Sequence, residues 1–145
     1  MKQSRLLIVA YLLHIAGWML PVAQEGVTIP QGLPGWQAFR VASCAVWPYE
    51  GFAIRGWYNV VLSTLSAATT LFFVIGSIWV VLLGSPLVRR ISAWIAAFAF
   101  GVNAHWIIRF GSDHFALRAG YFLWWFSFMF LSLGLFAPSP RAESQ

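Results

Sequence analysis

Four long stretches of this 145-residue chain contain no charged residue. They cover residues 6–24, 56–88, 91–108 and 119–140. A helix that crosses the hydrocarbon core of a bilayer needs about 20 mostly apolar residues. A charge at the centre of such a helix costs at least about 2.5–3.5 kcal/mol. The positions of the few charges therefore predict four membrane-spanning helices.

The composition excludes a soluble or disordered chain. Charged residues make up 9% of the sequence, against about 25% in soluble domains, and disordered chains lack the 18% of aromatic residues seen here. Backbone groups in lipid must be satisfied internally, and continuous apolar runs lack the alternation of a β-barrel strand. The sequence thus predicts an all-α, polytopic membrane protein, a four-transmembrane-helix bundle.

We place the spans at residues 6–23, 58–83, 91–109 and 119–136, in a single membrane domain that covers residues 1–145. Residues 84–86 (Gly-Ser-Pro) end the second helix, because Pro lacks an amide donor. The second span exceeds the thickness of the bilayer, and tilt can absorb the excess.

Arginine and lysine near the span ends set the orientation. One side would carry Lys2, Arg5, Arg89, Arg90 and Arg141, and the other Arg40, Arg55, Arg109 and Arg118. The Arg89–Arg90 pair is expected in a very short loop and weighs most, so both termini are predicted to be cytoplasmic. The basic start and apolar residues 6–20 also have the shape of a signal peptide. A retained helix is favoured, because cleavage would leave three spans.

The first loop, residues 24–57, is the longest connection and lies on the outer side. Residues 26–35 contain Pro30 and Pro34 and indicate an extended connector, and Pro48 ends a predicted short helix at 36–47. Aromatic residues at both ends of that helix are typical of a segment in the membrane interface. It is either an interfacial anchor or a surface for a partner, the candidates being Trp36, Phe39, Trp47 and Trp57.

Polar residues recur along one face of two predicted spans. The second span carries Asn59, Ser63, Ser66, Thr70 and Ser77, and the third carries Ser92, Ala96, Ala99 and Asn103. Small and hydroxyl residues allow membrane helices to approach closely and to hydrogen-bond. We expect the two faces to pack against each other; a polar path for a substrate is the alternative.

Two histidines lie within predicted spans. His14 shares a face with Ala10 and Gly17, and His105 precedes Arg109 by one turn. Histidine is a common haem ligand, but the two would differ by about 8 Å in depth. A hydrogen-bonded histidine between helices is therefore favoured for each, and a haem-associated subunit remains an alternative. Intramembrane ionisable residues are functional candidates in either case.

A polar cluster is predicted at the outer end of the third span. Its members are Glu50, Arg55, Arg109, Asp113, His114 and Arg118. Such a cluster suits an anionic ligand or a proton transfer, but solvated interfacial charges have the same pattern and contribute at most about 1 kcal/mol per pair.

No catalytic motif stands out, and an enzyme is not favoured. The single cysteine, Cys44, excludes an internal disulfide, and we find no zinc-ligand spacing, phosphate loop or nucleophile elbow. The net charge of +5 fits arginines that flank membrane spans better than a nucleic-acid surface. We expect no metal or cofactor, haem excepted as above.

Two short motifs carry a resemblance to a family. Residues 34–39 (Pro-Gly-Trp-Gln-Ala-Phe) precede residues 57–59 (Trp-Tyr-Asn) at the start of the second span. The chain in this respect resembles uncharacterised small four-helix proteins of the bacterial inner membrane. The resemblance implies a four-helix fold and a location in the bacterial inner membrane, and it implies no activity. The positions that match the family are Gly35, Trp36, Trp57 and Asn59.

The leading hypothesis is a non-enzymatic inner-membrane subunit that binds another membrane protein or itself. Nine Trp and 13 Phe supply more aromatic surface than anchoring needs, and aromatic residues are enriched in interface cores. The alternatives are a haem- or redox-associated subunit that uses His14 or His105, and a small oligomeric transporter or channel lined by the face from Asn59 to Ser77.

Overall fold

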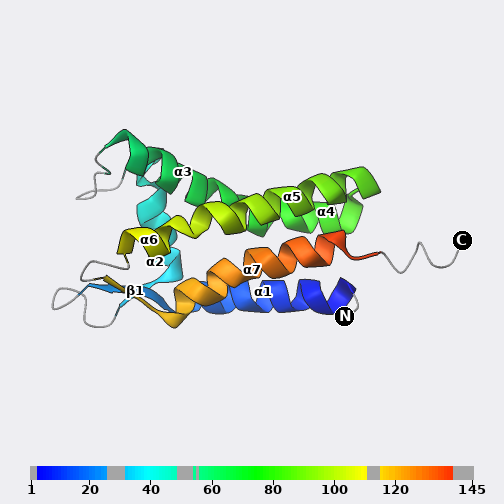
Figure 1. Ribbon diagram of the computed structural model, residues 1–145, viewed down its shortest axis with the longest axis horizontal. Coiled ribbons are helices and arrows are strands. Elements are labelled where there is room, and N and C mark those ends of the chain that lie inside the picture. The colour runs from blue at the N-terminus through cyan, green and yellow to red at the C-terminus, as the bar shows by residue number, and fades with distance from the viewer. Residues whose placement is uncertain (1–2, 26–31, 49–53, 55, 111–114, 139–145) are drawn as a thin grey trace, which may run out of the picture.

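The computed structural model describes residues 3–25, 32–48, 54, 56–110 and 115–138. Most of them are helical. Three helical stretches are long and apolar enough to cross a membrane, at residues 57–83, 86–108 and 119–136. These stretches and a shorter helix at the start of the chain lie roughly along the long axis of the molecule (Figure 1).

The first helix is shorter than predicted and lies earlier in the chain. α1 spans Gln3–Met19, and strand β1 follows at Pro21–Glu25. The prediction of a helix to residue 23 was therefore wrong at its end, because Pro21 cannot donate the amide hydrogen bond that would continue the helix. α1 is about 26 Å long at the usual helical rise.

The second helix lies within one residue of its predicted boundaries. α3 (Trp57–Leu71), a π turn (Phe72–Gly76) and α4 (Ser77–Leu83) form one continuous rod. The π turn is wider than an α-helical turn and adds about one residue to the rod at this point. The sequence pattern did not indicate it. Such turns occur mostly as single insertions in α-helices and often at functional sites.

The third helix starts earlier than predicted. α5 runs from Pro86 to Asn103, and the Ser85 hydroxyl accepts a hydrogen bond from the Val88 amide at 3.4 Å. Pro86 therefore begins this helix, as its fixed φ angle and missing donor allow. Placing Arg89 and Arg90 in a loop was wrong, because both lie inside α5.

After a break at Ala104, α6 covers His105–Phe110. The last helix, α7, matches its predicted range at Ala119–Phe136.

A small sheet joins the loops at one end of the bundle. β2 (Leu33–Pro34) and β3 (Phe115–Leu117) flank β1, both antiparallel to it, with Ala23 opposite Leu117. This sheet departs from the all-helical expectation. The strand pair β1–β3 prolongs the helix pair α1–α7, because β1 follows α1 and β3 precedes α7 (Figure 1). Residues distant in sequence therefore satisfy each other's backbone groups, which local patterns do not reveal.

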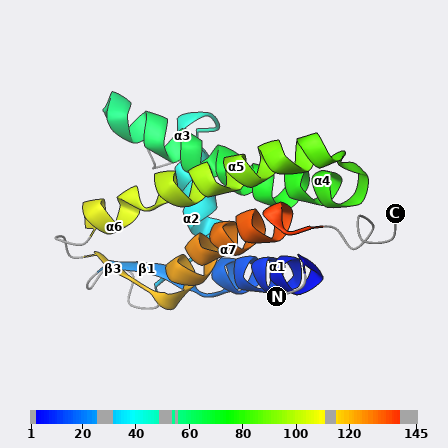
Figure 2. The same ribbon diagram turned by 45° about the vertical axis from the view of Figure 1, so that its right-hand side comes forward.

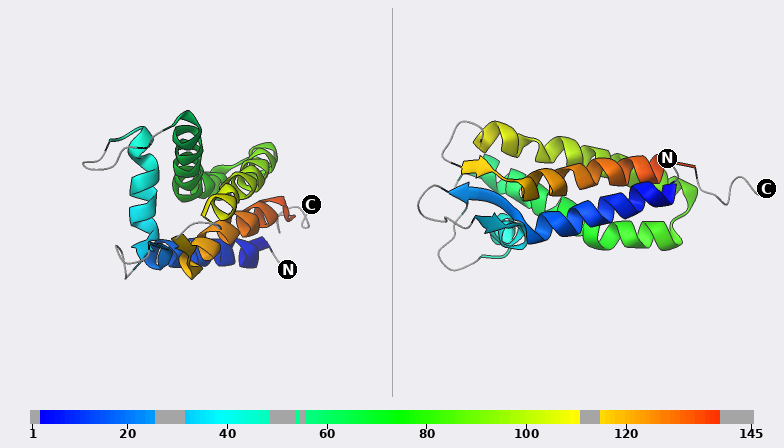
Figure 3. Two further views of the ribbon diagram at one scale, coloured as in Figure 1. Left: turned by 60° about the vertical axis from the view of Figure 1, so that its left-hand side comes forward. Right: turned by 90° about the horizontal axis from the view of Figure 1, so that it is seen from below.

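The predicted loop helix is present but ends early. α2 spans Gly35–Ala42 and continues as one 3-10 turn at Ser43–Ala45, so it stops two residues before Trp47. α2 runs steeply across the long axis of the bundle, between the end of α1 and α3 (Figures 1 and 3). Its position at the end of the bundle agrees with a helix that lies in the plane of an interface.

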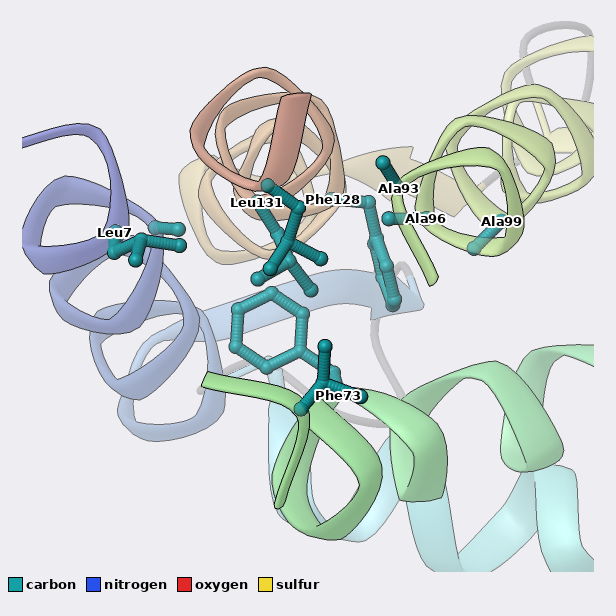
Figure 4. Packing of buried hydrophobic residues seen from close by; sticks show 10 residues of the cluster. Leu7, Phe73, Ala93, Ala96, Ala99, Phe128 and Leu131 are labelled. Carbon is teal, nitrogen blue, oxygen red and sulfur yellow. The ribbon is translucent and has the colours of Figure 1, made fainter. Parts of the chain in front are cut away.

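The helices pack around a core of small and aromatic side chains. α1 and α7 run antiparallel in the most extensive contact (Figures 1 and 2), and α5 packs against both α7 and α4. Figure 4 shows Leu7 of α1, Phe128 and Leu131 of α7, and Phe73 of the π turn pointing into the space between the helices, with three alanines of α5 alongside. We call the end that carries the sheet and α2 the sheet end. The opposite end, with Arg5, Arg89 and Arg90 near the starts of α1 and α5, is the arginine end (Figure 1).

Glycines allow the close approach of α1 and α7. A Cβ added at Gly17 would lie 2.6 Å from the Trp124 Cβ, and one at Gly134 would lie 2.8 Å from Leu7 Cδ2. Small residues are the usual means of close helix contact in membranes. The backbones of α1 and α7 therefore approach closely at Gly17 and at Gly134, and a larger side chain at either position would push the two helices apart.

Candidate functional site

His14 occupies the centre of the buried face of α1. Its side chain is 5% exposed, on the predicted face with Ala10 and Gly17. The imidazole stacks on Phe73 with 3.8 Å between ring centroids, and it meets Phe128 edge to face with 5.9 Å between centroids. His14 therefore joins α1 to the π turn and to α7.

The hydrogen bonds of His14 determine which ring nitrogen carries its proton. Nδ1 lies 3.0 Å from Ser127 Oγ, and the Ser127 hydroxyl donates to the Trp124 carbonyl. Because that hydroxyl proton is already used, Nδ1–H of a neutral ring must be the donor to Ser127. Nε2 then carries a lone pair, and it is buried without a hydrogen-bond partner among the described residues.

Tyr11 forms a second polar contact one turn from His14. Its hydroxyl lies 2.8 Å from Ser77 Oγ, and Ser77 donates to the carbonyl of Phe73. Tyr11 is therefore the donor to Ser77. The π turn is thus held to α1 by two contacts, from Tyr11 through Ser77 and from His14 through the Phe73 ring.

The two histidines do not form one cofactor site in this arrangement. The ring of His105 packs against Trp106, with its Nδ1 2.7 Å from the Val102 carbonyl, whereas His14 lies among Trp18, Phe73 and Phe128. An axial bond from His14 Nε2 to a haem iron would require this packing to open. Within the described part of the chain, no group of three or more His, Cys, Asp or Glu side chains is placed to hold a metal.

Asn103 is the centre of the polar contact between α3 and α5. Its Oδ1 accepts from the Ser66 hydroxyl at 2.6 Å, and its Nδ2 donates to Thr69 Oγ1 at 3.0 Å and to the Ala99 carbonyl at 2.9 Å. Trp106 Nε1 donates to Ser66 Oγ at 3.0 Å. Asn103 has no exposed surface, so its amide is fully used in holding the two helices together.

The predicted polar faces meet over only part of their length. Ser66 contacts Asn103 as expected, whereas Ser77 turns to Tyr11 of α1, and Thr70 donates to the Ser66 carbonyl of its own helix. Ser63 is buried and Asn59 is partly exposed near the start of α3. Ser66 and Thr70 are thus buried and hydrogen-bonded within the bundle, and the alternative of a polar path along this face stays a prediction.

Side chains of α7 satisfy the backbone at the break between α5 and α6. Trp125 Nε1 donates to the Phe100 carbonyl and the Tyr121 hydroxyl to the Asn103 carbonyl, both at 2.7 Å. Tyr121, Trp125, Tyr11 and Ser127 were not among the predicted site residues. A Tyr or Trp inside a span needs a partner for its polar group, and that requirement was the signal available in the sequence.

The predicted partner surface divides into two parts. Trp36, Trp47 and Trp57 are 52%, 70% and 79% exposed, whereas Phe39 stacks on Trp18 with 5.7 Å between centroids. Phe39 therefore fastens α2 to α1. The three tryptophans at the sheet end form an exposed set that we call the tryptophan surface.

Arg40 holds one member of the tryptophan surface in place. Its Nη1 donates to the Trp47 carbonyl at 2.9 Å, and its guanidinium lies 5.0 Å from the centroid of the Trp47 ring. Such a cation–π contact contributes about 0.5–1 kcal/mol at an exposed site. Trp47 is therefore ordered although it is exposed.

Most of the predicted outer polar cluster lies outside the described residues. This holds for Glu50, Arg55, Asp113 and His114 and for the side chain of Arg109, although the Arg109 backbone belongs to α6. Arg118 is exposed at the start of α7, and its amide donates to the Val22 carbonyl at 2.9 Å. Whether these charges form one site stays a prediction.

Comparison with models of known protein families, with curated proteins and with solved structures gave no match. The resemblance based on residues 34–39 and 57–59 therefore stays a prediction.

Proposed function

We propose that the chain is a four-helix integral protein of the bacterial cytoplasmic membrane that acts as a non-catalytic subunit by binding another membrane protein. Three helices are long and apolar enough to cross a bilayer. α1, at about 26 Å, approaches the core thickness of about 30 Å, and it packs along α7. α1 is therefore the fourth span of the proposal.

The outer surface of these helices suits contact with lipid. Large apolar side chains are exposed on α1 at Ile8, Leu12 and Ile15, and on α5 at Trp94 and Phe98. Arginines near the starts of α1 and α5 support a cytoplasmic arginine end, since such residues are retained on that side. The sheet end is then outside.

The tryptophan surface carries the proposal of a partner. The polar groups of Asn103, Ser66 and Tyr11 are engaged within the bundle, whereas Trp36, Trp47 and Trp57 are each more than half exposed in the segments at the sheet end. Tryptophan is enriched among residues that dominate binding energy. The ordering of Trp47 by Arg40 lowers the entropy that binding would cost.

Affinity purification from native membranes in a mild detergent tests this function. We expect the wild-type chain to retain a defined membrane protein, and W36A/W47A/W57A to retain at least about tenfold less of it, since such residues each contribute about 2 kcal/mol or more. The matched control I8A/L12A/I15A removes the same number of exposed apolar side chains from α1 and should retain the partner. Equal retention by both variants, or a lone wild-type monomer, would overturn the proposal.

A further inference from the structure

The arginine end concentrates positive charge from two helices. Arg5 lies in the first turn of α1, and Arg89 and Arg90 lie near the start of α5 (Figure 1). Within the described part of the chain, the one acidic residue is Glu25 of β1, at the sheet end. The positive charge therefore has no carboxylate to balance it among the described residues of its own end.

The position of Arg89 and Arg90 is unfavourable without an anion. The start of a helix carries a partial positive charge, and a basic side chain there costs about 0.3–1 kcal/mol. Arg89 is only partly exposed, and its Nε is buried without a hydrogen-bond partner among the described residues. A guanidinium that is only partly exposed and has no carboxylate nearby among the described residues suits a ligand with an anionic oxygen.

The surroundings of this pair are apolar and open. Leu83, Leu87 and Trp94 are 70%, 69% and 64% exposed, and they precede and follow the two arginines along the chain. A free phosphate gains no binding energy from apolar side chains, whereas a phospholipid carries acyl chains that can pack against them while its phosphate contacts the arginines. The combination of paired guanidinium groups and exposed apolar side chains therefore matches a lipid.

We propose that the arginine end binds an anionic phospholipid of the adjoining leaflet, with its phosphate at Arg89 and Arg90 and its acyl chains along Leu83, Leu87 and Trp94. Arg5 adds to the attraction from α1. This inference rests on the membrane insertion of the proposed function, but it does not depend on the tryptophan surface.

Native mass spectrometry of the purified full chain in a neutral detergent tests the proposal, with phosphatidylglycerol and phosphatidylcholine of identical acyl chains as probes. We expect wild type to retain phosphatidylglycerol preferentially. Each arginine near a membrane surface contributes about 1 kcal/mol, so R89Q should weaken that binding about fivefold and R89Q/R90Q about 30-fold. The control R118Q, which removes an exposed charge at the sheet end, should bind as wild type does.

Two further measurements test whether the loss of lipid in R89Q/R90Q comes from the loss of charge and not from misfolding, and whether the site binds a lipid and not free phosphate. R89K/R90K keeps both charges and should stay within about threefold of wild type, while millimolar inorganic phosphate should not displace the lipid. Equal retention of the two lipids, wild-type binding by R89Q/R90Q, loss of binding in R89K/R90K, or displacement by phosphate would each overturn the inference. Partner retention by R89Q/R90Q reports separately on the proposed function, because the tryptophan surface is intact in that variant.

Discussion

The imidazole of His14 lies flat against the ring of Phe73, with 3.8 Å between centroids and 7° between planes. This contact joins the first helix to the π turn of the second, and Ser127 of the fourth holds the imidazole from another side. One buried side chain therefore connects three of the four proposed spans. His14 is thus used for packing and satisfies the rule that buried polar groups are hydrogen-bonded at Nδ1 only, since Nε2 has no partner among the described residues.

Replacing His14 should separate its packing role from its polar role. H14A leaves a cavity beside Phe73, and we expect it to lower the free energy of unfolding by about 3 kcal/mol. H14F keeps an aromatic ring and removes the unpartnered Nε2, so the loss of the Ser127 bond should cost only about 1 kcal/mol. Unfolding by sodium dodecyl sulfate in mixed micelles measures both values. Equal losses in H14F and H14A would show that the polar role dominates, because both variants lack the Ser127 bond and only H14A loses the ring.

Two helical glycines offer a matched test of the contact between α1 and α7. A Cβ at Gly17 would lie 2.6 Å from the Trp124 Cβ, whereas nothing lies within 4 Å of one at Gly101. We expect G17A to destabilise the protein by about 2 kcal/mol through overpacking. G101A should be neutral or stabilising by about 0.5–1 kcal/mol, because alanine favours a helix over glycine. Thermal unfolding in detergent measures the pair, and equal melting temperatures would contradict the α1–α7 packing.

Asn103 should be the most sensitive polar position between α3 and α5. N103A removes the acceptor of Ser66 and the donor to Thr69 inside an apolar bundle. We expect a loss of about 2 kcal/mol. Ser63 is buried one turn before Ser66, and S63A is the control, with an expected change of at most about 0.5 kcal/mol. A greater loss in S63A than in N103A would place the main polar contact elsewhere.

Single cysteines can map the two ends of the bundle. In a C44S background, which keeps a donor for the Arg40 carbonyl that Cys44 bonds, S4C and S85C report on the arginine end and W47C on the sheet end. A membrane-impermeant maleimide should label W47C from outside intact cells, and S4C and S85C only in inside-out vesicles. Labelling of both S4C and W47C from outside would show that α1 does not cross the membrane, and labelling of S4C and S85C but not W47C from outside would reverse the predicted orientation.

The charge pattern predicted the rods well and their ends less well. The range 119–136 coincides with α7, and 58–83 differs from the observed rod by one residue at its start, because a lipid-compatible run has few alternatives to a helix. The ends depend on single residues instead. Pro21 stops α1 and Pro86 starts α5, since the same missing amide is harmful inside a helix and harmless in its first turn.

The candidate site could be predicted only in part. The face of α1 that carries His14 follows from helical periodicity, and the Ser66–Asn103 contact follows from two polar faces. The choice of Phe73 as the stacking partner depends on the π turn, and the strand pair β1–β3 joins residues that lie at least 90 positions apart. Local propensity carries no information on such pairings, which tertiary packing decides.

Photo-crosslinking in native membranes tests the central claim, that the tryptophan surface binds a membrane protein, most directly. A benzophenone amino acid at position 57 replaces the most exposed tryptophan of that surface, and one at position 12 replaces an exposed leucine of α1. We predict one discrete adduct of higher mass from position 57, containing a second membrane protein, and no such adduct from position 12. Adducts with lipid alone from position 57, or the same protein adduct from both positions, would contradict the claim.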